Sequence, residues 1–450
     1  MERKQQPKVC VHLLDKEKPY YFSPEQQKST PPNFFQHSLK LARDNLNYIA
    51  TCCCDPAQEL KLYVRSNKGS GPFTLCRNPN TGPRHKPSCS YYSRINTDGG
   101  AKAYSSAAVR EEEDGTLRIG LDFSLRVSTA DPERAAPAAM HPPRERKQVK
   151  RLKKMKMLGF LHLLWENTGL NEWAPWLEGK RRLTTVMTRL QKEASSIKQG
   201  RTVLADVLLL QGNEHTNKKA VSYACANSRR LIAISELNAW SPTMNVGNNL
   251  PLAGTTKSSP PAGMPYLTID SSRWERSLAR FPRDVAWWQR GGKIIAIAVT
   301  DVPVKKIAEK SGQEYFSASV RQVVFMMVSE RWIPLDSSYE GIIEEKLAKE
   351  RRQFIKPLIY DSAENQYHPD FILTDVNAAD FVPLEVWGRD TEDYLQHRAV
   401  KEKWYQQEFG DSWWSWDAVR DPRGDEIPTF PQRKKHYESK YPLEERETKC

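Results

Sequence analysis

Hydrophobic residues recur along this chain with two different periods, and each period predicts a different kind of element. Between residues 117 and 127 every second residue is apolar, which predicts a strand with one buried face. Between residues 158 and 210 apolar residues recur three and four apart, which predicts a helical module. The apolar stretches 293–302 and 317–332 are typical of two antiparallel strands.

Two more apolar stretches, near the end of the chain, each carry one acidic residue. Asp370 opens the first, and Glu385 lies inside the second, residues 383–388. Because two neighbouring strands would bring both carboxylates to the same edge of a sheet, the pattern indicates a site for a hard cation such as Mg²⁺ or Mn²⁺. A structural interpretation stays open, in which Asp370 caps a turn and Glu385 is a solvated residue of an edge strand.

An amphipathic helix is predicted before these strands, over residues 339–352. Ile343 and Leu347 stand three and seven residues after Glu340, so Glu340 shares the face that must pack on the sheet. A solvated charged face is the plain alternative for Glu340.

A second helix is predicted after these strands, over residues 394–405. Tyr394, Lys401 and Tyr405 would fall near one face of it, because residues seven and eleven apart nearly complete whole turns. Lys401 could then point back at the two carboxylates, and Lys403 is the weaker candidate. In the alternative interpretation both lysines are ordinary solvated helix charges.

Cysteine and histidine residues near the start of the chain indicate a zinc site. Eight cysteines in a chain without a secretory signal argue against a disulfide framework and favour metal binding. Two strand-like runs, residues 60–65 and 73–75, would bring two ligand pairs together into a closed structural site. Cys53 or Cys76 could replace a member of the first pair, and buried free thiols are the alternative without metal. The expected ligands are Cys52, Cys54, His85 and Cys89.

The composition favours a cytoplasmic protein that meets nucleic acid. The formal net charge is +13 and the pI is about 9.2, which suits a polyanion such as DNA and also an anionic membrane surface. The longest apolar runs, residues 294–299 and 323–328, are too short to cross a bilayer. Neither a phosphate-binding glycine loop nor a G-x-S-x-G elbow occurs in the sequence, so energy transduction and serine-hydrolase chemistry have no support.

The order of the C-terminal residues resembles the PD-(D/E)xK nuclease superfamily, whose core is restriction-endonuclease-like. The residues that carry this resemblance are Glu340, Pro369-Asp370-Phe371, Leu384-Glu385-Val386-Trp387, Tyr394, Lys401 and Tyr405. The usual lysine, two residues after the second acid, is replaced by Trp387. Some branches, including nuclease domains fused to helicases, carry their lysine on the following helix, and Lys401 is similar to these in its spacing from Tyr394 and Tyr405.

This resemblance implies roles for four residues. Asp370 and Glu385 would hold Mg²⁺ or Mn²⁺, Lys401 would orient the attacking water and stabilise phosphate charge, and Glu340 would be an auxiliary ligand or base. Because Trp387 occupies the lysine position, an alternative stays open in which the protein retains the fold and binds DNA without cutting it.

Most of the chain also resembles a bacterial family known as domain of unknown function 1173, which is common on plasmids and integrative elements. Its residues here are Cys52-x-Cys54, the stretch from Leu75 to Cys89, Leu158-Gly-Phe-Leu-His-Leu-Leu-Trp165 and Phe354-Ile-Lys-Pro-Leu358. The position of Cys76 looks variable in that family, which makes Cys76 the weakest zinc candidate.

Together these patterns predict a multidomain α+β protein that hydrolyses DNA with a catalytic Mg²⁺ or Mn²⁺ and a structural Zn²⁺. An inactive DNA-binding or assembly factor is the main alternative, and a zinc-dependent regulator acting through protein contacts alone is a third. Whether two chains pair, and which protein partners bind, the sequence leaves open. The expected segments are 1–128 (zinc-binding β-rich module), 129–157 (basic linker), 158–240 (helical module), 241–265 (flexible linker), 266–337 (β-rich bridge) and 338–450 (nuclease-like domain).

Overall fold

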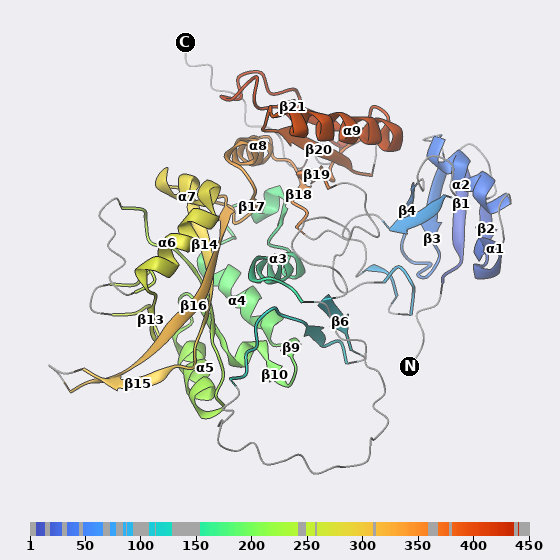
Figure 1. Cartoon of the computed structure of the whole chain (residues 1–450). Coiled ribbons are helices and arrows are strands. Elements are labelled where there is room, and N and C mark those ends of the chain that lie inside the picture. The colour runs from blue at the N-terminus through green and yellow to red at the C-terminus, as the bar shows by residue number, and fades with distance from the viewer. Residues whose placement is uncertain are drawn as a thin grey trace. The chain divides into compact units, whose positions relative to one another are not determined.

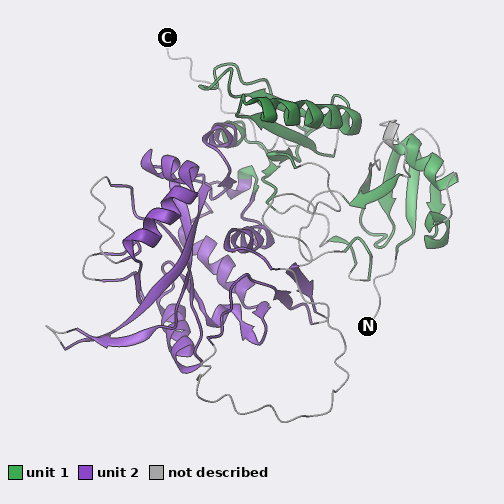
Figure 2. Cartoon of the chain, in the orientation of Figure 1, with its two compact units in different colours: residues 1–102, 172–175, 346–450 green, residues 103–171, 176–345 purple. Residues whose placement is uncertain are grey.

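The computed structural model of the chain divides into two compact units (Figures 1 and 2). Unit 1 comprises residues 1–102, 172–175 and 346–450, and unit 2 comprises residues 103–171 and 176–345. Both units mix helices with sheets, so the α+β class expected from the sequence is confirmed. The structure describes residues 6–13, 19–28, 34–44, 48–65, 73–77, 84–86, 88–92, 108–112, 114–127, 154–241, 249–256, 259–308, 312–358, 368–377, 380–435 and 440.

The N-terminal part of unit 1 is an antiparallel sheet with strand order β2-β1-β3-β4-β5. Helix α2 packs on it and buries Phe35 and Leu39 against Val9 and Val11 of β1. The strand-like runs expected at residues 60–65 and 73–75 are present as β4 and β5. The elements are β1 (Val9–Leu13), β2 (Tyr20–Phe22), α1 (Pro24–Lys28), α2 (Phe34–Asp44), β3 (Tyr48–Cys52), β4 (Leu60–Arg65) and β5 (Thr74–Arg77).

The C-terminal part of unit 1 is a second sheet, with strand order β21-β20-β19-β18-β8. Strands β18, β19 and β20 pair antiparallel, whereas β20 and β21 pair parallel, which requires a crossover that helix α9 provides. The helices expected near residues 339–352 and 394–405 are present as α8 and α9. The elements are β8 (Glu172–Trp173), β18 (Phe354–Ile355), β19 (Phe371–Leu373), β20 (Val382–Trp387), α9 (Glu392–Phe409) and β21 (Trp414–Asp417), preceded by α8 (Ser338–Lys349), most of which belongs to unit 2.

A buried ion pair fixes the ends of β18 and β19. Arg352 and Asp375 are 2% and 0% exposed, and the guanidinium donates to both carboxylate oxygens at 3.0–3.3 Å. Lys356 is also buried, 5.5 Å from the ring centroid of Phe371. The basic segment that follows α8 therefore has an internal role at these two positions.

Unit 2 is built on a sheet with strand order β11-β12-β14-β16-β13, to which β15 and β17 add at β16. Strands β14 and β16 are antiparallel, as expected from the two apolar stretches, and helices α3, α6 and α7 pack on β16. A smaller sheet has strand order β10-β9-β7-β6. The elements are β6 (Val109–Glu111), β7 (Leu117–Ile119), α3 (Met157–Asn167), α4 (Leu183–Ala194), β9 (Ile197–Gln199), β10 (Thr202–Val203), β11 (Leu208–Leu210), α5 (Glu214–Ala226), β12 (Ile232–Glu236), β13 (Tyr266–Thr268), α6 (Ser271–Arg280), α7 (Pro282–Gln289), β14 (Lys293–Thr300), β15 (Val304–Ile307), β16 (Glu314–Val328) and β17 (Pro334–Leu335), with two short 3₁₀ turns, η3 (Pro175–Leu177) and η4 (Leu204–Asp206).

The long strand predicted over residues 117–127 is wrong in its length, since β7 ends at Ile119. Leu121 and Leu125 are nevertheless buried, as the alternation requires. Beyond Ile119 the backbone changes partners, because the N–H of Leu125 donates to the side chain of Gln199 rather than to a neighbouring strand. The alternation therefore predicted correctly that Leu121 and Leu125 are buried, but it did not show where the strand ends.

The middle of the chain is less helical than its pattern predicts. Helices α3, α4 and α5 are present, but strands β8 to β12 lie among them. Leu208–Leu210 forms a fully buried strand parallel to β12, and such strands read as continuous apolar runs that periodicity does not separate from buried helices.

The compact units cut across the six expected segments, since β8 joins the sheet of unit 1 and β11 to β17 share one sheet. Of the two expected linkers, residues 129–153, 242–248 and 257–258 lie outside the described residues. None of the helices in the described part of the chain is long and apolar enough to span a bilayer.

Asp284 in the first turn of α7 generates a prediction about stability. Burial raises its pKa to about 7, and the negative charge of Asp336 adds to this effect. Because the folded protein holds this proton more tightly than the unfolded chain, stability falls as pH rises from about 4 to about 7. We expect Asp284→Asn, which keeps an acceptor for the N–H of Met327, to stabilise the protein by on the order of 2 kcal/mol at pH 8.

The measurement is denaturant unfolding of the wild type and the variant across this pH range. The two curves should converge below about pH 4, as Asp284 becomes protonated in both states. Equal stability at pH 8 would contradict the prediction.

Candidate functional site

Strands β19 and β20 bring the two predicted carboxylates together. Phe371 pairs with Leu384, so Asp370 and Glu385 lie next to this pair on adjacent strands. The N–H of Asp370 donates to the carbonyl of Leu384 at 2.9 Å, and Oδ2 of Asp370 accepts the N–H of Val386 at 2.7 Å. The backbone N–H of Val386, the residue after Glu385, thus fixes the orientation of the Asp370 carboxylate.

Glu385 is only 1% exposed, and helix α9 supplies partners for both of its oxygens. Lys401 Nζ lies 2.7 Å from Oε2, and the hydroxyl of Tyr405 donates to Oε1 at 2.6 Å. Since Lys401 and Tyr405 are one turn apart on α9, a single helix face satisfies the buried carboxylate. Figure 1 shows α9 lying along β20 and β21.

The pKa of Glu385 is raised to about 8, mainly because burial disfavours the charged carboxylate. The neighbouring charge of Asp370 raises this pKa further, while Lys401 and Tyr405 lower it. At neutral pH, without a cation, Glu385 therefore mostly retains its proton.

Lys401 is held from three directions. Besides Glu385, its ammonium donates to the carbonyl of His368 at 2.9 Å and lies 5.6 Å from the ring centroid of Trp387. Trp387, the residue in the usual lysine position of the resemblance, is 2% exposed and forms a wall of the site. The lysine charge thus reaches the two acids from α9.

Arg398 also contacts this site, although the sequence patterns did not indicate it. Its guanidinium stacks 5.1 Å from the ring centroid of Trp387 and pairs with Asp417 of β21 at 2.7 Å. The available signal was its position three residues before Lys401, which places both on one helix face.

Glu340, the expected auxiliary acid, belongs to unit 2, whereas the other three residues belong to unit 1. It is 4% exposed, and one carboxylate oxygen accepts the N–H of Asp336 at 3.0 Å. Glu344, one turn further along α8, is 1% exposed and pairs with Arg331 at 3.3 Å. Glu340 is therefore buried, and its role beside Asp370 and Glu385 stays a prediction.

The four expected zinc ligands converge at the end of β3. All four ligand atoms lie within 4.8 Å of one another. Cys52 Sγ and Cys89 Sγ are 3.7 Å apart, and His85 Nδ1 lies 3.5 Å from Cys54 Sγ and 3.8 Å from Cys89 Sγ. Around a tetrahedral Zn²⁺ two sulfurs would be about 3.8 Å apart, and a sulfur and a nitrogen about 3.6 Å. The cluster could therefore hold a structural metal such as zinc.

The surroundings of the cluster suit a thiolate. Cys52, Cys89 and His85 are buried, and the N–H of Tyr91 donates to Cys89 Sγ at 3.4 Å. The contact between Cys52 and Cys89 lowers the pKa of Cys89 and raises that of Cys52, so one thiolate is shared by this pair, and His85 lowers the pKa of Cys89 further. A deprotonated sulfur is the form that binds metal.

The remaining cysteines of the described part of the chain lie outside this cluster and are not disulfide-bonded. Cys53 is adjacent in sequence, yet its N–H donates to the carbonyl of Lys8, and it is absent from the four-residue cluster. Cys76 lies on β5 and is absent from it as well. Neither proposed substitute replaces Cys52 or Cys54.

Metal content should depend on Cys89 and not on Cys53. We expect about one Zn²⁺ per wild-type chain in elemental analysis, and at least a large loss of that metal in Cys89→Ser, because the substitution removes one of four ligands. Cys53→Ser is the matched control and should retain its zinc. Equal zinc in all three proteins would remove Cys89 from the ligand set.

Comparison with known proteins gives one match. No curated protein and no solved structure matches the chain. A family model described as "Protein of unknown function (DUF1173)" matches residues 23–419, a range that contains both the Cys/His cluster and the Asp370, Glu385 and Lys401 group. Because this match covers most of the sequence, the chain belongs to the DUF1173 family.

Proposed function

We propose that this protein is a metal-dependent nuclease that hydrolyses phosphodiester bonds of DNA. One observation carries the proposal: Lys401 on α9 lies 2.7 Å from Glu385, beside Asp370 on the adjacent strand. Two acids and an ammonium group converge, although the usual lysine position holds Trp387. This arrangement agrees with the branches of the PD-(D/E)xK superfamily that the sequence resembles.

The donor set suits Mg²⁺ or Mn²⁺, which prefer carboxylate oxygens. Asp370 is partly exposed, and its Oδ1 has no hydrogen-bond partner among the described residues. Each oxygen of Glu385 has two lone pairs, so it can accept one hydrogen bond and still face a cation. A bound ion would supply a polarised water and neutralise charge on the phosphodiester.

Side chains and backbone groups of the protein would orient the two carboxylates and stabilise charge on the phosphate. Val386 fixes the orientation of Asp370 through its backbone N–H. Hydrogen bonds from Tyr405 and Lys401 favour the ionised form of Glu385, which a bound cation would complete by displacing the proton. The ammonium of Lys401, 20% exposed as a side chain, would stabilise negative charge on the phosphate.

The Cys/His cluster would serve the fold rather than the chemistry. A closed set of three sulfurs and one imidazole leaves no position for water or substrate. Bound zinc would join the end of β3 to His85 and Cys89.

A second candidate function is DNA binding without turnover. The observation that favours it is the closed network of Glu385, whose two oxygens are already bonded and whose pKa is near 8. If the proton on Glu385 is never displaced by a cation, the fold would persist without hydrolysis. The net charge of +13 suits DNA in either case. A cytoplasmic location, a mobile-element context and pairing of two chains remain predictions of the sequence.

Cleavage should require all three residues of the group. With Mg²⁺ or Mn²⁺, we expect Asp370→Ala, Glu385→Ala and Lys401→Ala to lower the rate of DNA cleavage by about a hundredfold or more, because the first two each remove a ligand of the cation and the third removes the charge that stabilises the phosphate. Plasmid, linear duplex and single-stranded DNA should each be tested, with DNA binding measured separately.

Lys403→Ala provides the matched control. Lys403 lies on the same helix two residues away and is exposed, so its loss should leave cleavage within about twofold. Equal losses in Lys401→Ala and Lys403→Ala would contradict a specific role for Lys401. Binding without cleavage under every metal condition would favour the second candidate function.

Metal affinity should rise with pH. Because the pKa of Glu385 is about 8, a cation that displaces its proton should bind up to about tenfold more tightly for each pH unit between 6 and 8, and then level off. Tyr405→Phe removes a hydrogen bond that favours the ionised form, so the curve should move to higher pH. Calorimetry with Mn²⁺ across this range is the measurement, and a flat profile in the wild type would contradict it.

A further inference from the structure

Four arginines from three segments far apart in sequence gather in unit 2. Arg126 and Arg229 are directly opposite each other in an isolated antiparallel β-bridge. The N–H of Val127 donates to the carbonyl of Ser228, and the N–H of Arg230 donates to the carbonyl of Leu125. Like charges placed opposite each other across a bridge are destabilising. The fold therefore places the positive side chains of Arg126 and Arg229 opposite each other at a cost in stability.

The turn that presents Arg229 is itself strained. Ser228 has φ +49°, a left-handed conformation that is uncommon for residues other than glycine. It follows the end of α5 and directs the chain into the bridge with Arg126. Strain of this kind persists where the surrounding structure requires it, and it is concentrated at functional positions.

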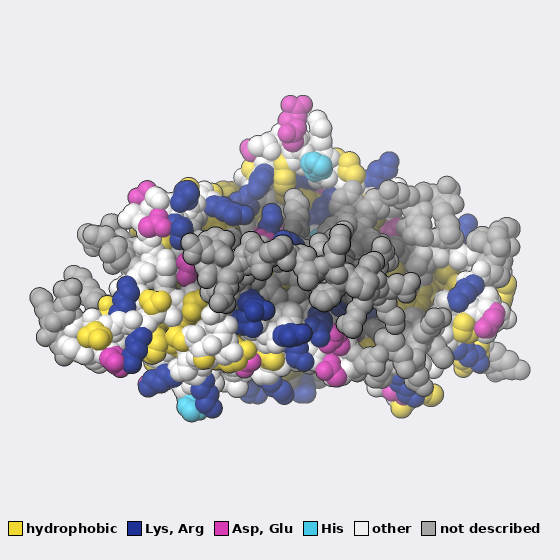
Figure 3. Space-filling model, turned by 60° about the horizontal axis from the view of Figure 1, so that its bottom comes forward, with side chains coloured by type: hydrophobic (Ala, Val, Ile, Leu, Met, Phe, Trp, Pro, Cys, Tyr) yellow, Lys and Arg dark blue, Asp and Glu magenta, His cyan; other side chains and the backbone are white. Residues whose placement is uncertain are grey.

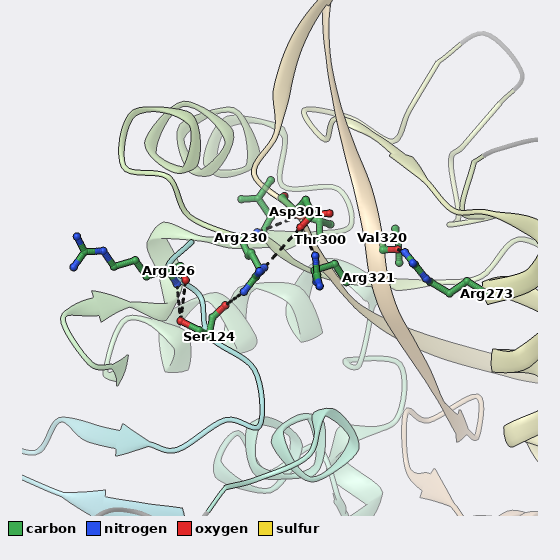
Figure 4. A network of polar contacts seen from close by, with 9 residues as sticks. Ser124, Arg126, Arg230, Arg273, Thr300, Asp301, Val320 and Arg321 are labelled. Atoms are coloured by element: carbon green, nitrogen blue, oxygen red, sulfur yellow. Dashed lines mark hydrogen bonds and ion pairs between the residues drawn. The ribbon is translucent and has the colours of Figure 1, made fainter. Parts of the chain in front are cut away.

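One acidic residue serves two of these arginines. Arg321 Nη1 donates to Asp301 Oδ1 at 2.8 Å, and Arg230 Nε lies 3.8 Å from the same oxygen (Figure 4). Arg230 also donates to the carbonyl of Ser124 at 2.6 Å. Four guanidinium groups and one carboxylate leave three positive charges unmatched within these contacts.

Arg229 shows the need for a partner most directly. Its Nε and Nη1 are shielded from solvent and lack a hydrogen-bond partner among the described residues. A guanidinium carries five N–H donors in a fixed planar fork, and leaving them unpaired away from water is costly. The charge of Arg229 is thus not compensated by these contacts, and a phosphate at the neighbouring exposed side chain of Arg126 would offset it electrostatically.

The arrangement fits a row of phosphates better than one small anion. In Figure 4 the guanidinium of Arg126 points away from Asp301, toward which Arg230 and Arg321 converge. The charges are therefore spread along a surface, with the side chains of Arg126 and Arg321 exposed. Figure 3 shows several groups of Lys and Arg side chains on the face of the molecule turned toward the viewer, with fewer Asp and Glu among them.

We propose that Arg126, Arg229, Arg230 and Arg321, the arginine surface, bind the phosphate backbone of duplex DNA. This inference rests on the proposed function in taking DNA as the partner, and it places a binding surface in unit 2, whereas Asp370, Glu385 and Lys401 lie in unit 1. Arginine suits this role because its planar fork can contact two phosphate oxygens at once.

The test compares two triple variants with the same loss of charge. One is Arg126→Gln, Arg229→Gln and Arg321→Gln, which leaves Arg230 in contact with Asp301. The control is Arg276→Gln, Arg280→Gln and Arg290→Gln, on exposed positions at α6 and α7. Binding of a labelled duplex is measured by fluorescence polarisation against salt concentration, with EDTA present so that no cleavage occurs.

We expect the first variant to bind at least about tenfold more weakly near 0.1 M salt, and its log–log salt slope to fall by about 2.7, the value for three lost phosphate contacts. The control should stay within about threefold of wild type with an unchanged slope. Equal binding by the two variants would overturn the arginine surface. If the triple variant fails to fold, Arg126→Gln alone, at an exposed position, should lower the slope by about 0.9, and no change would overturn the proposal.

The outcomes also separate this inference from the proposed function. Wild-type protein that binds DNA through the arginine surface but never cuts it would contradict the nuclease and support the surface. Wild-type protein that cuts DNA, with binding unchanged in the first variant, would contradict only the surface.

Discussion

Burial of the Glu385 carboxylate is the constraint on which the C-terminal sheet and its helix depend. A carboxyl group that is 1% exposed in the middle of a strand is costly unless partners replace its water. Only α9 supplies such partners within the described residues, through Lys401 and Tyr405. The helix must therefore pack along β20, and the parallel pairing of β20 with β21 follows from that crossover. Arg398 adds a second link between α9 and β21 through Asp417.

Local patterns identified the parts of this site because each part lies on one element. Alternation and apolar runs located β19 and β20, and helical spacing put Lys401 and Tyr405 on one face of α9. The same patterns could not show that residues 172–173 complete this sheet as β8, because that pairing joins Trp173 to Phe354, about two fifths of the chain apart. They also gave no sign of the Arg352–Asp375 pair, since two opposite charges 23 residues apart resemble ordinary surface residues until both are buried.

The Cys/His cluster was predictable for a different reason. Metal ligands are uncommon residue types, so two close pairs are visible without knowledge of the fold. The structure adds the geometry: Cys52 ends β3 and its Sγ lies 3.7 Å from Cys89 Sγ, while His85 Nδ1 lies 3.8 Å from Cys89 Sγ, distances that fit a tetrahedral site. By contrast, the arginine surface was invisible in the sequence, because Arg126, Arg229 and Arg321 are about a hundred residues apart and arginine is common. Rare residue types reveal sites in sequence, and common ones reveal them only after folding.

The central claim is that the group of Asp370, Glu385 and Lys401 cuts DNA although Trp387 occupies the usual lysine position. The most direct measurement is a single-turnover time course, with wild-type protein in excess over an end-labelled DNA duplex, in Mn²⁺ and in EDTA. Single-turnover conditions reveal even slow chemistry, because product release does not limit the signal. The account predicts labelled fragments that accumulate only with Mn²⁺. Duplex that is fully bound and remains intact in both samples would contradict it.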